Sequence, residues 1–207
     1  MCLILFTVEY PAGYRMILAA NRDEFYERPT ASLHFWPDAP DILAGRDLKS
    51  GGTWLGITRN RRFAAITNYR DPASIRPEAP SRGGLVAKFL LGTETAPAYL
   101  QRTAPSAMGY NGFNLILADD SGAYWFCNRT NGFEKLPPGI YGLSNHLLDT
   151  PWPKVRLGKE RFRLMAGSMA ETTTNAFFDL LLDQTYPPDT QLPKTGVAPA
   201  GHQRLSP

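Results

Sequence analysis

The sequence predicts an α+β fold in which strands come first, helices follow, and the same order is then repeated. Short apolar runs rich in β-branched and aromatic residues fill the first third of the chain, and amphipathic segments follow them. The strands do not alternate one by one with helices, as they do in parallel α/β folds. Several strands are apolar on both faces, which is typical of sheets covered on both sides. The 207 residues fit one domain, 1–207, with one sizeable core.

The first two strands are predicted to form a β-hairpin. Two apolar runs, 3–8 and 16–20, flank a Pro-Ala-Gly turn sequence centred near Ala12. With that centre, the sequence positions of two paired residues add up to about 24. Cys2 is therefore expected opposite Arg22 across the ladder. The hairpin would bring the start of the chain against the polar cluster Asn21-Arg22-Asp23-Glu24.

The remaining elements follow from the same patterns. Before the first helix, strands are predicted at 33–36, 42–45, 53–58 and 63–67. Ser81 is the predicted N-cap of a helix in which apolar residues recur at helical spacing, and a short helix at 95–102 comes next. Three more strands, 111–117, 123–127 and 140–143, precede two helices, 154–169 and 175–182. From Tyr186 onward the composition is rich in Pro, Thr and Gly.

Composition excludes several classes of protein. The net charge is only +3 and the basic residues are scattered, which argues against a nucleic-acid partner. Two cysteines make no disulfide framework, which is typical of a reducing compartment. No apolar run is long enough to span a membrane, and the first is too short for a signal peptide. A cytoplasmic protein without an integral membrane segment is therefore expected.

Cys2 is the candidate nucleophile. Methionine is readily trimmed before a small residue such as Cys, and a terminal Cys carries its own base, an α-amine with a pKa of about 7.7–8.0. Arg22 would lower the thiol pKa, while Asp23 or Glu24 would orient the amine. The alternative is a buried cysteine at a strand start, with Asn21, Arg22 and Asp23 forming a salt-bridged turn.

Several other candidate site residues also allow two interpretations. Asn68 and Asn145 each end an apolar strand, where Asn either serves a turn or donates to a ligand. Gly51-Gly52 makes a turn or lets a ligand approach the backbone, and Trp54 beside it lines a predicted apolar cleft or belongs to the core. Arg70 is a solvated loop residue or binds a carboxylate.

The histidines show no metal-ligand spacing, so no metal site is predicted among His34, His146 and His202. His146 follows Asn145 and is a candidate contact for a substrate. Cys127, inside a strand, is predicted to be a buried core thiol.

Seven motifs occur in register along the chain: Met1-Cys2 before an apolar strand, Asn21-Arg22-Asp23-Glu24, Gly51-Gly52-Thr53-Trp54-Leu55-Gly56, Thr67-Asn68-Tyr69-Arg70, Ser81-Arg82-Gly83, Gly112-Phe113-Asn114-Leu115, and Leu143-Ser144-Asn145 followed by Pro151-Trp152-Pro153-Lys154. Together they resemble the NRDE family, the group of the eukaryotic transport-and-Golgi-organization-two proteins and their bacterial relatives. The resemblance implies an N-terminal-nucleophile (Ntn) hydrolase-like fold, a four-layer αββα sandwich of two antiparallel sheets. Family members usually continue with further C-terminal strands, so the chain is expected to lack them.

The resemblance also implies roles for residues, because the more distant Ntn acylases begin Met-Cys. Cys2 would be nucleophile and base together, Arg22 and Asp23 would steady the thiolate and the amine, and Asn145 with Asn68 would supply oxyanion donors. Asn21, Glu24, Trp54, Arg70 and His146 are the expected ligand contacts.

Three functions follow. The first is an amidohydrolase cleaving a small-molecule, non-peptide C–N amide through an acyl-Cys2 intermediate, with no cofactor required. The second is a carrier, because relatives are linked to haem mobilisation and acyl-lipid handling; haem or an acyl ligand would then be the cargo. The third is a scaffold that kept the fold without the chemistry.

Overall fold

The computed structural model describes residues 2–11, 13–130, 132–168 and 173–183. The centre of the predicted first turn, the end of the helix predicted at 154–169, His202 and the Pro-rich stretch after Tyr186 lie outside these residues. Two compact units make up the chain. The three-stranded unit comprises the described parts of 1–23, 70–72 and 137–207, and the seven-stranded unit comprises those of 24–69 and 73–136.

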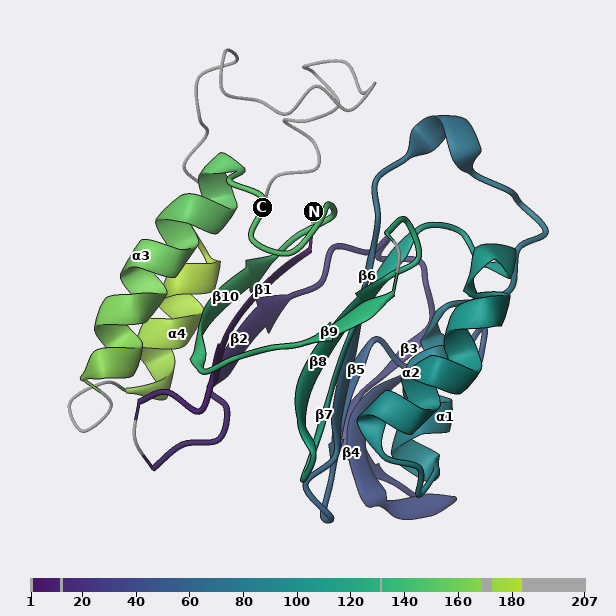
Figure 1. Ribbon diagram of the computed structural model, residues 1–207, viewed down its shortest axis with the longest axis horizontal. Helices are drawn as coiled ribbons and strands as arrows, with labels where there is room; N and C mark the ends of the chain where they lie inside the picture. Colours follow the sequence, from purple (N-terminus) through teal and green to yellow (C-terminus); the bar gives the residue numbers. More distant parts are fainter. Residues whose placement is uncertain (1, 12, 131, 169–172, 184–207) are drawn as a thin grey trace. The chain divides into compact units, whose positions relative to one another are not determined.

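The three-stranded unit is built on a short antiparallel sheet. Its strands β1 (Leu3–Val8), β2 (Leu18–Asn21) and β10 (Gly139–Leu143) lie in the order β10-β1-β2. Two helices, α3 (Pro153–Gly167) and α4 (Thr174–Leu181), pack against one face of this sheet (Figure 1). The core between sheet and helices contains Leu3, Leu5, Trp152, Val155 and Phe162.

The predicted register of the first hairpin is confirmed. Leu3 pairs with Asn21 and Phe6 with Leu18, so the numbers of paired residues sum to 24 along the whole β1–β2 ladder. Cys2 and Arg22 are the next residues beyond its last pair. All six residues of β1 are buried, as expected for a strand that is apolar on both faces.

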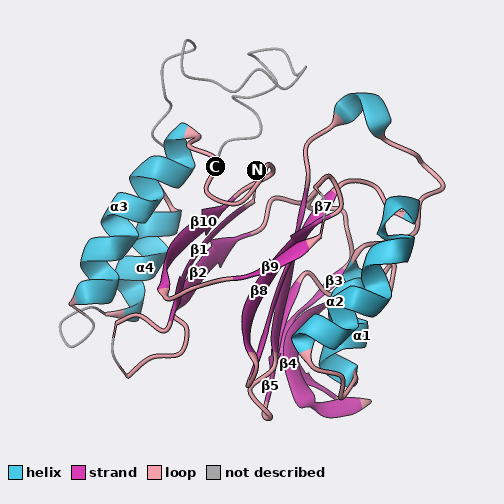
Figure 2. Ribbon diagram, viewed as in Figure 1, coloured by secondary structure: helices cyan, strands magenta, loops and turns pink. Residues whose placement is uncertain are grey.

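The seven-stranded unit holds one antiparallel sheet whose strands follow chain order. They are β3 (Thr30–Trp36), β4 (Ala39–Asp47), β5 (Leu55–Thr58), β6 (Phe63–Asn68), β7 (Phe113–Asp119), β8 (Gly122–Cys127) and β9 (Phe133–Lys135). Helices α1 (Gly83–Leu91) and α2 (Ala96–Thr103) cover one face of the sheet, as Figure 2 shows. Two short 3-10 helices, η1 (Pro72–Ser74) and η2 (Ala104–Gly109), complete the elements of the fold.

The predicted α+β class and the two antiparallel sheets are therefore confirmed, while three local predictions were wrong. The strands predicted at 33–36 and 42–45 are the longer β3 and β4, because their ladder continues to Thr30 and Asp47 through polar residues. β9 was missed, since a three-residue strand with two charged side chains has no apolar pattern. Ser81 does not cap α1: the N-cap is Arg82, with a helical backbone and no side-chain capping bond.

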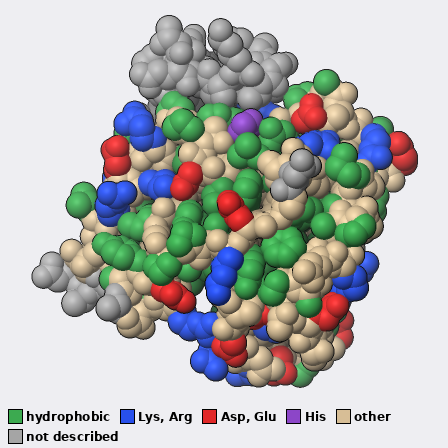
Figure 3. Space-filling view, viewed as in Figure 1, with side chains coloured by type: hydrophobic (Ala, Val, Ile, Leu, Met, Phe, Trp, Pro, Cys, Tyr) green, Lys and Arg blue, Asp and Glu red, His purple; other side chains and the backbone are tan. Residues whose placement is uncertain are grey.

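No helix in the described parts of the chain has the length and apolarity needed to cross a bilayer. On the face seen in Figure 3, basic and acidic side chains are interspersed rather than gathered into single-sign patches.

Candidate functional site

Cys2 lies half-buried at the head of β1, and side chains hold the peptide unit that joins it to Leu3. The Oδ1 atom of Asn21 accepts a 3.0 Å hydrogen bond from the N–H of Leu3. The Oγ hydroxyl of Ser144 donates a 2.9 Å hydrogen bond to the carbonyl oxygen of Cys2. Both bonds hold the one peptide unit between Cys2 and Leu3, so the thiol is carried on an ordered strand start.

Arg22 and Asp23 follow directly on β2, at positions that continue the β1–β2 register toward Cys2. Arg22 is half-buried and Asp23 is exposed. The structure therefore brings the expected arginine to the end of the sheet that carries Cys2.

Asn145 and Arg70 lie together in the same unit. The backbone N–H of Arg70 donates a 2.7 Å bond to the carbonyl oxygen of Asn145, and the Asn145 side chain is buried. The Arg70 guanidinium carbon lies 5.8 Å from the centroid of the Trp152 ring, within the range of a cation–π contact. Because burial penalises the charge, it lowers the pKa of Arg70.

His146 also belongs to this group. Its ring centroid lies 5.6 Å from that of Trp152, and its Nδ1 atom is 2.9 Å from the hydroxyl of Thr150. That hydroxyl also donates a 2.8 Å bond to the carbonyl oxygen of Leu147. Burial lowers the pKa of His146 and so favours the neutral imidazole.

Lys154 is the member of the group that the sequence reasoning did not single out. It is the second residue of α3, just after Trp152 and Pro153. Burial lowers the pKa of Lys154 to about 7, the thiol of Cys2 raises it, and the positive charge of Arg70 lowers it further. The signal was present in the Pro-Trp-Pro-Lys motif, but a lysine in a first helical turn looks like a solvated charge until the helix is placed.

Three predicted site residues lie in the seven-stranded unit. Asn68 is the exposed last residue of β6, paired with Phe113. Trp54 is partly buried and packs against the helix-side core of the large sheet, which gives it a packing role. The third, Glu24, belongs to a polar network.

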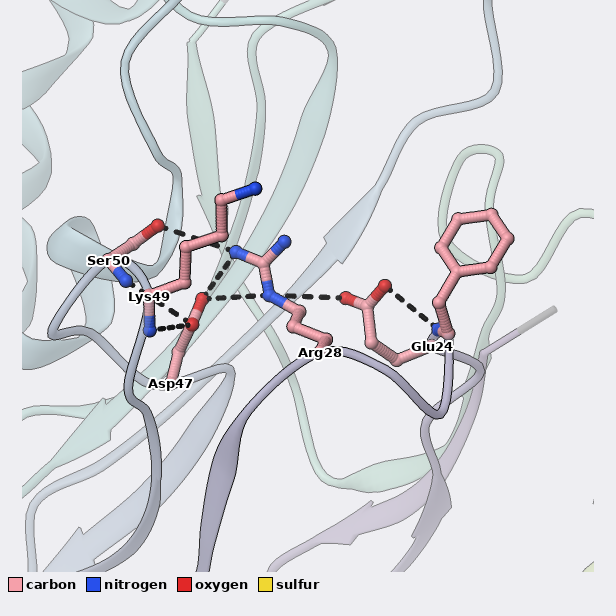
Figure 4. A network of polar contacts seen from close by, with 6 residues as sticks. Glu24, Arg28, Asp47, Lys49 and Ser50 are labelled. Carbon is pink, nitrogen blue, oxygen red and sulfur yellow. Dashed lines mark hydrogen bonds and ion pairs between the residues drawn. The ribbon is translucent and has the colours of Figure 1, made fainter.

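Figure 4 shows this network, which links the loop before β3 to the end of β4. Arg28 lies 3.7 Å from a carboxylate oxygen of Glu24 and donates a 2.6 Å bond to Asp47. Burial pushes the pKa of Asp47 upward, but the bonds from Arg28 and from the N–H groups of Lys49 and Ser50 outweigh it and lower that pKa. Glu24 therefore contributes to the order of this loop.

The Gly51-Gly52 pair is explained by the approach of a helix. A Cβ atom on Gly52 would lie 2.5 Å from the carbonyl carbon of Gly83, at the start of α1. The N–H of Thr53 also donates to the Gly83 carbonyl at 3.3 Å. Gly52 therefore permits the close approach of the first turn of α1, and the positive φ of 73° at Gly51 fits the predicted turn.

Within the described residues, no three His, Cys, Asp or Glu side chains are grouped as metal ligands would be. Cys127 is fully buried in β8, and burial raises the pKa of its thiol. The prediction of a buried core thiol at this position is confirmed.

The sequence matches the family described as Transport and Golgi organisation 2 over residues 1–207. The chain belongs to the Transport and Golgi organisation 2 family. This confirms the resemblance to the NRDE group.

Curated relatives agree with this assignment. The chain is 39% identical to the human Transport and Golgi organization protein 2 homolog and 38% identical to the mouse homolog, each over all of this chain and 79% of the relative. It is 31% identical to the Drosophila melanogaster Transport and Golgi organization protein 2, over 84% of this chain and 68% of that protein.

Proposed function

We propose that this protein is an amidohydrolase of the N-terminal-nucleophile type, with Cys2 as its nucleophile and the four-layer αββα sandwich as its fold. The observation that carries the proposal is the setting of Cys2. Its carbonyl oxygen is bonded to Ser144, its neighbour Leu3 is bonded to Asn21, and Arg22 continues the β1–β2 register beside it. A cysteine placed beside cationic groups on an ordered element is the usual environment of a reactive thiol.

The proposed reaction begins when Met1 is removed and the α-amine of Cys2 accepts the thiol proton. The thiolate attacks the carbonyl carbon of an amide, and the C–N bond breaks after the protonated α-amine gives its proton to the leaving nitrogen. Water then attacks the resulting thioester, the α-amine takes the water proton, and the carboxylic acid leaves while Cys2 recovers its thiol. No cofactor is required by these steps.

Amide donors near the thiol would stabilise the oxyanion of the tetrahedral intermediate. Asn145 is the proposed first donor, since it lies buried beside Ser144 and Arg70 in the unit that carries Cys2. Each such donor is worth roughly 2.7–4 kcal/mol of transition-state stabilisation in enzymes where it has been removed.

A panel of small non-peptide amides tests the proposal, with the released amine as the readout. We expect protein that begins at Cys2 to hydrolyse at least one class. Cys2→Ala should abolish turnover, whereas Cys127→Ala, which removes the buried thiol of β8, should keep it. Equal residual turnover in the two variants would refute a Cys2-centred mechanism.

The names of the relatives support a second candidate, carriage of a small ligand, because they describe transport and Golgi organization. His146 favours haem as that ligand. Burial favours its neutral imidazole, which is the form that binds iron.

Haem titration followed by absorbance separates this candidate from the hydrolase. We expect His146→Ala to abolish saturable binding if haem is carried, and Cys2→Ala to keep it. His34→Ala is the matched control, because His34 also holds its Nδ1 near an oxygen atom, 2.6 Å from the carbonyl of Ser32. Titration with an acyl-CoA tests the acyl ligand in the same way, with Trp54→Ala as the variant.

A further inference from the structure

The loop between β10 and α3 carries three of the candidate site residues, Ser144, Asn145 and His146. Two bonds tie this loop to other parts of the three-stranded unit. The Ser144 hydroxyl donates to the carbonyl oxygen of Cys2 at 2.9 Å, and the carbonyl oxygen of Asn145 accepts from the N–H of Arg70 at 2.7 Å. The position of the loop therefore determines how the head of β1 is held.

Asp149 closes the base of the loop. Its Oδ1 atom accepts a 2.8 Å bond from the N–H of Gly142 on β10, and its own N–H donates a 2.8 Å bond to the carbonyl oxygen of Gly142. The same Oδ1 atom accepts a 2.7 Å bond from Nζ of Lys159 on α3, which packs over β10 (Figure 1). One carboxylate oxygen thus joins the strand before the loop to the helix after it.

The surroundings of Asp149 favour a short side chain that accepts hydrogen bonds. A Cβ atom on Gly142 would lie 2.8 Å from Cγ1 of Val155 and 3.0 Å from Cγ of Lys159, so α3 and the stem of Lys159 lie directly against the strand. Asp149 itself has a φ of 55°, in the left-handed region that Gly, Asn and Asp tolerate and that strains other residues. An acceptor at position 149 can therefore reach β10 and α3 together.

The other bonds of this segment act within it. Thr150 donates to the carbonyl oxygen of Leu147 from its N–H at 3.1 Å and from its hydroxyl at 2.8 Å. That hydroxyl also lies 2.9 Å from Nδ1 of His146, and the N–H of Trp152 donates to the carbonyl oxygen of Thr150 at 2.7 Å. These bonds shape the loop, whereas those of Asp149 fasten it to β10 and α3.

We propose that Asp149 is a positioning residue for the Cys2 site. It holds the 143–148 loop closed, and the loop in turn holds Ser144 on the backbone of Cys2 and keeps Asn145 buried. The catalytic consequence rests on the proposed function, in which Asn145 is an oxyanion donor. The consequence for the reactivity of the Cys2 thiol requires no turnover.

Three variants isolate the side chain of Asp149. Asp149→Gly removes the carboxylate, and glycine adopts the left-handed backbone without strain. Asp149→Asn is the conservative variant, because it keeps an accepting oxygen and also tolerates this backbone. Asp183→Gly is the matched control in the same unit: the Asp183 carboxylate forms a 2.6 Å ion pair with Arg161, and its side chain is 34% exposed, compared with 36% for Asp149.

The first measurement is the rate at which iodoacetamide alkylates Cys2 in the full chain at fixed pH, located by peptide mass spectrometry. Asp149→Gly should raise this rate about fivefold, the factor that corresponds to the net value of one hydrogen bond. Asp149→Asn should restore most of the wild-type behaviour, and Asp183→Gly should match the wild type. Slow alkylation of the buried Cys127 reports that each variant is folded.

A double variant shows whether Asp149 acts through Ser144. Ser144→Ala breaks the bond to Cys2 directly, so Asp149→Gly should add little to it, because effects along one path of contacts are not additive. If Asp149→Gly does not fold, Lys159→Met takes its place, with Arg161→Met as its control. Lys159→Met removes only the bond to α3, so it should raise the Cys2 rate by less, and Arg161→Met should leave it unchanged.

The second measurement uses an amide that the protein hydrolyses. Asp149→Gly should lower kcat about tenfold or more and leave KM nearly unchanged, because a displaced oxyanion donor is missed mainly in the transition state. Asp149→Asn should recover most of kcat. A purely structural loss of folded protein would not be rescued in this way and would also lower the rate in Asp183→Gly.

Two results would overturn the inference: Cys2 alkylation that is the same in the Asp149 variant, or in Lys159→Met, as in its matched control, and full additivity with Ser144→Ala. If the alkylation results hold and no amide is hydrolysed, Asp149 positions the loop and the hydrolase fails. If amides are hydrolysed while Asp149→Gly leaves both Cys2 alkylation and kcat unchanged, the hydrolase stands and the inference fails.

Discussion

The hydroxyl of Ser144 is bonded to the backbone carbonyl of Cys2, which precedes it by 142 positions in the chain. This bond ties the loop after β10 to the head of β1. Replacing Ser144 with Ala should cost about 1 kcal/mol, the usual net value of one hydrogen bond. It should also loosen the head of β1 and so change the rate of Cys2 alkylation.

Ser106→Ala is the control for Ser144→Ala. The Ser106 hydroxyl also donates to a backbone carbonyl, that of Thr103, at 3.0 Å. Chemical denaturation should show similar losses for the two variants, whereas only Ser144→Ala should alter Cys2 alkylation. An equal alkylation change in both would mean that the Ser144 bond has no special effect on the thiol.

Two glycines near the start of α1 should respond oppositely to alanine. At Gly52 a Cβ atom would lie 2.7 Å from the carbonyl oxygen of Gly83 and 2.9 Å from the nitrogen of Gly84, so Gly52→Ala should destabilise the fold by about 1–3 kcal/mol. At Gly84 nothing lies within 4 Å, so Gly84→Ala should gain up to about 1 kcal/mol of helix propensity. Urea midpoints measured at an unchanged slope test both; a stable Gly52→Ala protein would contradict the close approach.

The buried amine of Lys154 makes stability depend on pH. Its pKa in the folded protein, about 7, is below the ordinary 10.5, so the unfolded chain binds more protons between these values. The free energy of unfolding should therefore rise with pH across that interval. Lys154→Met removes the titration, so its stability relative to the wild type should be greatest near neutral pH and should fall as the pH increases. A constant difference would show that Lys154 titrates normally.

Arg22 and Asp23 should affect Cys2 differently in protein whose Met1 has been removed. Arg22→Ala should move the alkylation profile of Cys2 toward that of a free thiol, because a nearby cation favours the thiolate. Asp23→Asn should act mainly on the titration of the α-amine. The measurement is the alkylation rate against pH, and a Cys2 profile indifferent to Arg22 would remove Arg22 from the site.

Much of the fold follows from local patterns in the sequence. The first hairpin was placed in its correct register because one turn sequence and two apolar runs determine which residues pair. The edge strands of the large sheet were harder to predict from the sequence. β3 and β9 carry polar residues, which a partly exposed edge tolerates, and so they lack a clear apolar pattern. The N-cap of α1 was misplaced because the helix begins after Arg82 without a side-chain capping bond, so no capping residue marks its start in the sequence.

The site was predictable only where the hairpin determined it. One short ladder brings together Asn21, Arg22 and Cys2, and the register of that ladder could be predicted from the sequence. Lys154 and Arg70 come from distant segments, and their proximity depends on how α3 packs on β1. Local spacing carries no information about such packing. For the same reason Asn68 and Trp54 were grouped with Cys2 by motif alone, although they lie in the seven-stranded unit.

The most direct measurement is capture of the acyl intermediate. Protein that begins at Cys2 is mixed with p-nitrophenyl esters carrying acetyl to dodecanoyl chains, and the adduct is located by intact and peptide mass spectrometry. We predict one acyl group on the Cys2 thiol, released by hydroxylamine, lost in Cys2→Ala and retained in Cys127→Ala. Protein that carries no acyl group on Cys2, or carries it equally on Cys127, would contradict a nucleophilic role for Cys2.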